Sequence, residues 1–249
     1  MIYLDNNATT QLAPELTEIA EKVRHIYGNA SSVHQSGQKA RRLINQAREI
    51  FASFLHCNEK NLIFTSCATE SINMVLQSVF LPLNPNKNHL IVSAVEHAAV
   101  LETAKYLEKQ GVKVTYLKVD AQGNLDLEVL QSNISESTAL IAMMYANNET
   151  GKIFPIHEIG KLAREAGVPL LCDAVQVAGK LDLHLDQLPV DFMVASAHKF
   201  HGPKGVGLLY FHPQQKLKAL LAGGRQERGY RAGTENVGGI YLAAKAFEW

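Results

Sequence analysis

Lys199 stands in the run Ser-Ala-His-Lys-Phe-His-Gly-Pro at residues 196–203, and its place is the first chemical signal in this sequence. The apolar residues at 191–197 predict a buried strand that delivers the lysine into a loop rich in glycine and proline. Burial penalises an ammonium charge, so a lysine in such a place usually serves chemistry rather than packing. A lysine amine with a lowered pKa, shielded from water, condenses with an aldehyde to form an imine. We therefore expect Lys199 to bind an aldehyde cofactor.

Four other predicted strands also end in polar residues. Thr69, at the start of a helix, follows the strand at 61–66, and His97 follows the strand at 89–95. Asn148 follows residues 139–146, and Asp173 follows residues 168–172. The carboxyl ends of strands in an open α/β sheet collect ligands. A helix N-terminus holds phosphate, imidazole stacks on flat rings, and a buried carboxylate needs a cationic partner such as a protonated pyridine nitrogen. Each residue alone fits an ordinary structural role, but together they predict a pyridoxal phosphate site.

The elements that must position these residues alternate along the chain. Strands separated by helices indicate βαβ units and an α/β domain with a mainly parallel sheet. Strands are predicted at 61–66, 89–95, 113–119, 139–146, 168–172, 192–197 and 205–211. Helices are predicted at 36–55, 69–80, 98–110, 156–166 and from residue 236 onward. The last helix reaches Trp249 without a stop signal, so we expect the chain to be cut within an element.

Composition excludes several classes of protein. The 249 residues are 47% hydrophobic and 19% charged, with a formal net charge of zero, which disfavours binding to nucleic acid or an anionic membrane. No signal peptide and no apolar run of membrane-spanning length is present in the sequence. The three separated cysteines, Cys57, Cys67 and Cys172, fit a reducing compartment. We therefore expect a cytoplasmic protein with no membrane or nucleic-acid partner.

Other cofactors lack their motifs in this sequence. It contains no G-x-G-x-x-G, no G-x-x-x-x-G-K-[ST] and no G-x-S-x-G, which argues against dinucleotide binding, a P-loop and a serine hydrolase. His198 and His201, with Asp173 or His97, could be imagined as a metal site. Their spacing crosses a Gly-Pro loop and lacks the geometry of a helical ligand pair, so we expect no metal.

The chain resembles the cysteine desulfurases of the NifS/IscS group, which are class V aminotransferase relatives. Essentially all 249 residues share the resemblance, through motifs at 3–10 (YLDNNATT), 68–71 (ATES), 96–97 (EH), 147–151 (NNETG), 173–176 (DAVQ), 196–199 (SAHK) and 227–236 (ERGYRAGTEN). It implies the large domain of a fold type I pyridoxal phosphate enzyme, an α/β fold with a mostly parallel mixed sheet sandwiched by helices. Residues 1–15 would be the N-terminal segment of the small domain or a dimer arm. Residues 16–235 would be the cofactor-binding domain, and residues 236–249 the start of a helix leading to an absent C-terminal small domain.

The resemblance also implies roles for individual residues. Lys199 would form the imine and, once freed by substrate, would move protons with help from His97, which would also stack on the ring. Asp173 would pair with the pyridine nitrogen, while Asn148 and Gln176 would contact the ring or its phenolic oxygen.

The phosphate group has its own implied set of residues. It would be held by residues at two strand ends, namely Ala68, Thr69, Ser196 and His198. Thr234 would reach the phosphate of the partner subunit, which makes the expected enzyme a homodimer. Asn7 and His34 lie in matching segments, with roles assigned less specifically.

The implied reaction removes sulfur from L-cysteine to give L-alanine and an enzyme persulfide. The sulfur would then pass to an acceptor such as an iron–sulfur scaffold protein. In the family, the persulfide-forming cysteine and the arginine that binds the substrate carboxylate lie beyond the position of residue 249, so this chain alone is expected to be inactive in sulfur transfer. Cys57, Cys67 and Cys172 are interpreted as incidental thiols rather than substitute sulfur acceptors. A selenocysteine lyase, another fold type I lyase or aminotransferase, and a non-catalytic module for cofactor binding or dimerisation remain alternatives.

Overall fold

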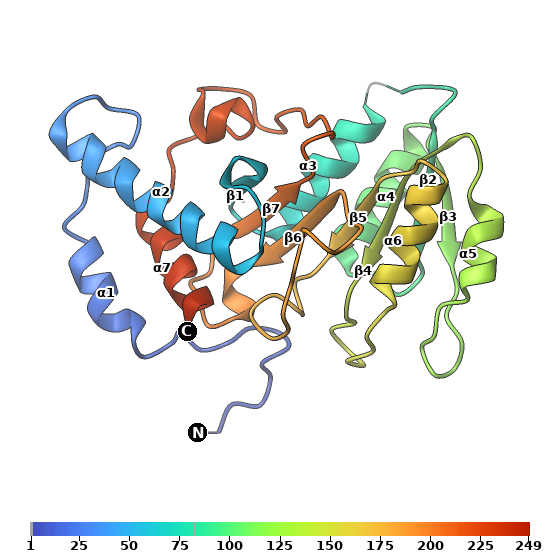
Figure 1. Ribbon diagram of the computed structural model, residues 1–249, viewed down its shortest axis with the longest axis horizontal. Helices are drawn as coiled ribbons and strands as arrows, with labels where there is room; N and C mark the ends of the chain where they lie inside the picture. Colours follow the sequence, from blue (N-terminus) through green and yellow to red (C-terminus); the bar gives the residue numbers. More distant parts are fainter. Residues whose placement is uncertain (1, 82) are drawn as a thin grey trace.

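Seven short apolar segments form a single sheet in the computed structural model, which describes residues 2–81 and 83–249 (Figure 1). Most strand residues are buried, because helices cover both faces of the sheet. The strands are β1 (Leu62–Thr65), β2 (His89–Ser93), β3 (Lys113–Leu117), β4 (Thr138–Met144), β5 (Leu170–Asp173), β6 (Phe192–Ser196) and β7 (Gly207–Phe211).

The order of the strands in the sheet is β1-β7-β6-β5-β4-β2-β3. The pairs from β6 to β3 are parallel, whereas β7 is antiparallel to both β6 and β1. A parallel return needs a crossover of a dozen or more residues, and the connection between Ser196 and Gly207 is shorter than that. The structure confirms the predicted α/β fold with a mixed, mostly parallel sheet.

Helices lie on both sides of this sheet. They are α1 (Leu16–Val23), α2 (Gln35–Phe54), α3 (Ala68–Phe80), α4 (Ala98–Lys109), α5 (Leu127–Asn133), α6 (Ile156–Glu165) and α7 (Val237–Glu248). Three 3₁₀ turns are η1 (Glu59–Asn61), η2 (Ala197–Lys199) and η3 (Gln226–Gly229). Helices α2, α6 and α7 cover one face of the sheet, and α3 and α4 cover the other (Figure 1). The side chains of each set form a hydrophobic cluster with the face that they cover.

The longest helix, α2, shows how the sequence specifies this packing. Its buried residues include Ala40, Ile44, Ala47 and Phe51, which recur at helical spacing and place one stripe against the core. The Phe51 ring lies 5.0 Å from the ring of Phe247 on α7, measured between centroids. The first and last long helices of the chain therefore pack side by side.

Two helices, α1 and α5, are absent from the sequence-based expectation. Helix α5 has only seven residues, too few for a clear apolar period, although Asp126 accepts hydrogen bonds from the backbone N–H groups of Glu128 and Val129 as an N-cap. Helix α1 starts after Glu15 without a side-chain cap, so no N-terminal signal marks it. The domain boundaries after residues 15 and 235 stay predictions, and Met1 of the first segment lies outside the described residues.

Among the helices of the described ranges, none is long and apolar enough to cross a membrane.

Candidate active site

A cavity of about 450 Å³ opens where the carboxyl ends of β1, β2, β4, β5 and β6 meet, at the edge of the sheet that the sequence predicts. Its volume falls in the range of ordinary small-molecule sites. It is lined by nine of the ten predicted site residues, namely Ala68, Thr69, His97, Asn148, Asp173, Gln176, Ser196, His198 and Lys199. The tenth, Thr234, is exposed between η3 and α7 and does not line this cavity.

The N-terminus of α3 forms one wall of the cavity. Cys67 is its N-cap residue and makes no side-chain hydrogen bond to the first turn, so Thr69 lies inside the helix rather than at its cap. The backbone N–H groups of this turn carry the positive end of the helix dipole. A Cβ at Gly207 on β7 would lie 2.5 Å from the carbonyl carbon of Cys67, so only glycine lets β7 approach this closely. The wall suits an anionic group such as phosphate.

Lys199 lies in the turn η2 directly after β6 and is half-buried. Its Nζ donates a hydrogen bond to the backbone carbonyl of Asn7, which also accepts a hydrogen bond of 3.0 Å from Gln176 Nε2. Burial lowers the pKa of Lys199, and the charges of Asp173, Asp5 and Glu149 partly offset this effect. The amine therefore loses its proton more readily than an exposed lysine.

Asp173 ends β5 at the floor of the cavity and is buried. Its Oδ1 accepts a hydrogen bond of 3.0 Å from the backbone N–H of Val175. Burial raises the pKa of this carboxyl, while the hydrogen bond from Val175 and electrostatic interactions with His97 and Lys199 act in the opposite direction. A cation bound in the cavity would further stabilise the ionised form.

His97 is the N-cap of α4, and its side chain is held by the helix that it caps. Its Nδ1 accepts a hydrogen bond of 3.1 Å from the backbone N–H of Ala99. In this tautomer Nε2 carries the proton and is free to face a ligand. The ring can therefore act as a proton donor from the mouth of the cavity.

Glu96 is a buried acid near the cavity. The sequence did not predict its burial, because one of its hydrogen-bond donors, Met144, comes from a distant part of the chain. Its Oε1 accepts hydrogen bonds from Ser93 Oγ at 2.6 Å and from the backbone N–H of Met144 at 3.0 Å. Its Oε2 is buried and has no hydrogen-bond partner among the described residues. Burial, with a smaller contribution from the charge of Asp173, raises the pKa of Glu96 to about 8. Glu96 is therefore mostly a neutral acid at pH 7.

The remaining residues considered from the sequence, namely Asn7, His34 and the three cysteines, differ in their positions relative to the cavity. Asn7 lines the cavity, whereas the side chain of His34 caps α2 by accepting a hydrogen bond of 3.3 Å from the backbone N–H of Gly37. Cys67 also lines the cavity. Burial raises the pKa of Cys57 to about 12 and that of Cys172 well above its usual value, which keeps both thiols protonated and unreactive.

The sheet order and the cavity at its strand ends define an α/β protein with the pyridoxal phosphate fold type I architecture. The family model "Aminotransferase class-V" matches residues 2–249, and the chain belongs to this family.

Similar proteins and structures cover nearly the whole chain. A cysteine desulfurase of Trichormus azollae is 47% identical over 249 residues, which is 100% of this chain and 62% of the relative. The cysteine desulfurase IscS of Dictyoglomus turgidum is 44% identical over 99% of this chain and 63% of its own length. A solved "NIFS-LIKE PROTEIN" superposes with a TM-score of 0.96 at 43% identity, covering 99% of this chain and 68% of that one. A structure described as "SspA in complex with cysteine" has a TM-score of 0.96 at 36% identity, covering 100% of this chain and 72% of that one. The chain thus spans a little over three-fifths of the length of these curated relatives.

Proposed function

We propose that the protein is a cysteine desulfurase that uses pyridoxal phosphate to remove sulfur from L-cysteine, giving L-alanine and persulfide sulfur for an acceptor such as an iron–sulfur scaffold protein. The observation that carries the proposal is the convergence of Lys199, Asp173 and His97 in one cavity beneath the N-terminus of α3. The substrate is inferred from relatives named cysteine desulfurase, which are up to 47% identical to this chain. Because the chain spans only part of their length, the activity, substrate and acceptor are proposed for the whole protein.

The residues of the cavity fit the separate chemical parts of pyridoxal phosphate. The first turn of α3, with Ser196 and His198 opposite, suits the phosphate. The buried carboxylate of Asp173 suits the protonated pyridine nitrogen, and the half-buried amine of Lys199 suits the aldehyde. When bound, pyridoxal phosphate supplies an electron sink for the bonds around the α-carbon of an amino acid.

The chain's own residues would then position the substrate and move protons. Lys199 Nζ, whose pKa is lowered by burial, would accept a proton from the substrate and return it at a neighbouring atom. His97 would donate and accept a proton at Nε2 while α4 holds its Nδ1. Asp173 would keep a proton on the pyridine nitrogen, and Asn148 and Gln176 would orient the ring.

Binding of the cofactor gives the direct test of this site. We expect the purified chain to develop visible absorption with added pyridoxal phosphate, and borohydride to fix the cofactor on the peptide that contains Lys199. Lys199→Ala should abolish both signals. Lys204→Ala is the matched control, because this lysine is exposed in the same loop and does not line the cavity. Fixation on another lysine would refute the assignment.

Substrate comparison separates the alternatives. The whole protein, loaded with cofactor, should release alanine from L-cysteine. Consumption of L-selenocysteine alone would favour a selenocysteine lyase, amino-group transfer to a keto acid would favour an aminotransferase, and cofactor binding without turnover would favour a binding module. The proposal includes a homodimeric, cytoplasmic enzyme. Within it, residues 1–15 would be the N-terminal segment of the small domain or a dimer arm, residues 16–235 the cofactor-binding domain, and residues 236–249 the start of a helix leading to the small domain.

A further inference from the structure

Two loops that are distant in sequence meet at the edge of the sheet opposite the cavity. His56 lies two residues after the end of α2, while His184 and Asp186 lie in the connection between β5 and β6. The backbone N–H of Leu185 donates a hydrogen bond of 3.0 Å to the carbonyl oxygen of Leu55, which joins the two loops. This connection precedes β6, whereas Lys199 follows it, so the loops and the cavity lie at opposite ends of the same strand.

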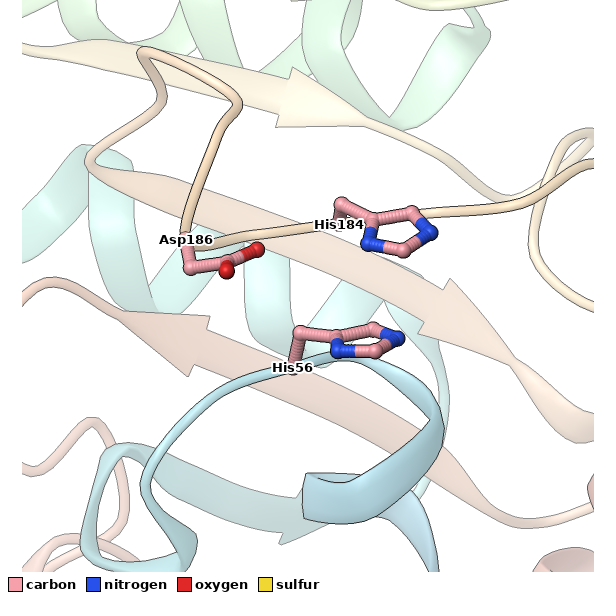
Figure 2. Close-up of side chains that lie close together, drawn as sticks. All are labelled: His56, His184 and Asp186. Carbon is pink, nitrogen blue, oxygen red and sulfur yellow. The ribbon is translucent and has the colours of Figure 1, made fainter.

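Three side chains capable of binding metal converge where these loops meet. The rings of His56 and His184 stack with centroids 4.0 Å apart and an interplanar angle of 16°. One potential ligand atom from each of His56, His184 and Asp186 lies within 4.8 Å of the other two. Figure 2 shows the two rings one above the other, with the Asp186 carboxylate facing their edge. Across residues 2–81 and 83–249, no other group of three histidine, cysteine or acidic residues meets this criterion.

The backbone holds one of these histidines in an uncommon conformation. His56 has a φ of 51°, in the left-handed region that residues other than glycine seldom adopt. Together with the Leu185–Leu55 hydrogen bond, this conformation places the ring of His56 beneath that of His184. The pairing of the two rings is thus set by the backbone of both loops.

A metal ion would require the side chains to rotate and their ligand atoms to approach one another. Bonds of about 2.0–2.1 Å from zinc to nitrogen or oxygen place tetrahedral ligand atoms about 3.3 Å apart. The rings are nearly parallel, so at least one must rotate for both lone pairs to point at one ion. His56 and Asp186 are exposed and His184 is half-buried, which leaves room for this rotation.

We propose that His56, His184 and Asp186 bind a divalent transition metal ion, Zn²⁺ in the first instance, with water completing the coordination. Two imidazoles and a carboxylate are donors that suit zinc, and this set differs from the all-oxygen sets that suit magnesium or calcium. The ion would tie the end of α2 to the loop that leads into β6, and would act as a structural link.

Calorimetric titration with ZnCl₂ tests the site after the protein has been treated with a chelator. We expect the affinity for Zn²⁺ to fall at least about tenfold in His184→Gln and in His56→Asn, since each variant loses one ligand. Asparagine is chosen at position 56 because it tolerates the left-handed backbone. His157→Gln removes an exposed histidine from α6 outside the cluster and should leave the affinity unchanged.

Thermal unfolding distinguishes a lost ligand from a damaged fold. Zn²⁺ should raise the melting temperature of the unsubstituted protein and of His157→Gln, but not that of His184→Gln or His56→Asn. In the absence of Zn²⁺, all four proteins should melt at similar temperatures. The proposal is wrong if the unsubstituted protein binds no Zn²⁺ at up to 100 micromolar, or if Zn²⁺ binds equally well to His56→Asn and His184→Gln.

Discussion

At the scale of single residues, two neighbouring buried carboxyl groups differ in what surrounds them. Electrostatic interactions of Asp173 with His97 and Lys199 favour its ionised form. Glu96 receives two hydrogen bonds on Oε1, but its Oε2 has no partner among the described residues. Of the two, Asp173 is therefore suited to pair with a cation, and Glu96 is suited to remain protonated.

This difference predicts a pH dependence of stability. The folded-state pKa of Glu96, about 8, lies above its ordinary value of 4.5, so the folded protein binds the proton more tightly than the unfolded chain. The associated stabilisation is complete below pH 4.5 and is lost as the pH rises to 8, by up to about 1.4 kcal/mol per pH unit. Glu96→Gln keeps an oxygen for Ser93 and Met144 but cannot ionise. We expect urea unfolding between pH 5 and 9 to show a smaller loss of stability in this variant than in the unsubstituted protein.

The measurement is specific to Glu96 when the slope of the free energy of unfolding against pH is compared between the two proteins. Asp173 and Cys172 lie close to Glu96 and also have raised pKa values, but both residues remain in the variant. An identical pH profile for the two proteins would show that Glu96 is ionised in the folded state at neutral pH.

The positions and environments of single residues also differ in how far the sequence could predict them. The place of Lys199 follows from local information, because an apolar strand and a Gly-Pro loop adjoin it in the chain. The burial of Glu96 depends on β4, which supplies the N–H of Met144 from another part of the chain. The stacking of His56 on His184 depends on two distant loops that meet only in the folded molecule.

At the scale of elements, one buried ion pair joins α2, β1 and η3. Arg48 Nη2 lies 2.6 Å from Glu227 Oε1, and Arg48 Nη1 donates a hydrogen bond of 2.6 Å to the carbonyl of Leu62. The other carboxylate oxygen of Glu227 accepts a hydrogen bond of 2.9 Å from the backbone N–H of Phe64, and the guanidinium of Arg48 lies 4.6 Å from the centre of the Phe64 ring. The pair thus connects segments that are far apart in the sequence.

Loss of one partner should leave a buried charge without compensation. We expect Glu227→Gln and Arg48→Met each to lower the free energy of unfolding by about 3–5 kcal/mol, measured by urea denaturation. The double variant should lose less than the sum of the two single losses, because it leaves no unpaired charge. The exposed pair of Glu102 and Lys105, 2.7 Å apart, is the matched control, and Glu102→Gln should cost less than about 1 kcal/mol. Additive losses at Arg48 and Glu227 would contradict this account.

The prediction of helices and strands from the sequence fails where the local signal is short. It also fails where the direction of a strand depends on the strand with which it pairs. The apolar runs of β4 and β6 are clear in the sequence, and the structure places strands there. The residues of β7 do not by themselves predict that the strand is antiparallel. Its direction follows from the shortness of its connection to β6, together with the close approach that Gly207 permits.

At the scale of the whole molecule, the N-terminal part of the chain exposes large apolar side chains. Tyr27 and Val33, on the connection from α1 to α2, are 88% and 89% exposed, and Ile2 and Leu4 are exposed as well. We expect a partner molecule to cover some of these exposed side chains. A second copy of the protein is the partner that the proposed homodimer supplies. Thr234, exposed outside the cavity of its own chain, is the residue proposed to complete the site of that second copy.

Mixed dimers give a decisive test of a shared site. We expect Thr234→Val to weaken pyridoxal phosphate binding, because a phosphate hydrogen bond is lost, and Lys199→Ala to abolish borohydride fixation. If Thr234 acts across the interface, a dimer of one Lys199→Ala chain and one Thr234→Val chain has two unequal sites. One site carries both defects, and the other has both native residues. Mixing the two variants under conditions that exchange subunits should therefore restore native affinity to about half of the sites formed by mixed dimers. If Thr234 instead acts within its own chain, neither site of the mixed dimer is intact and no native affinity should return.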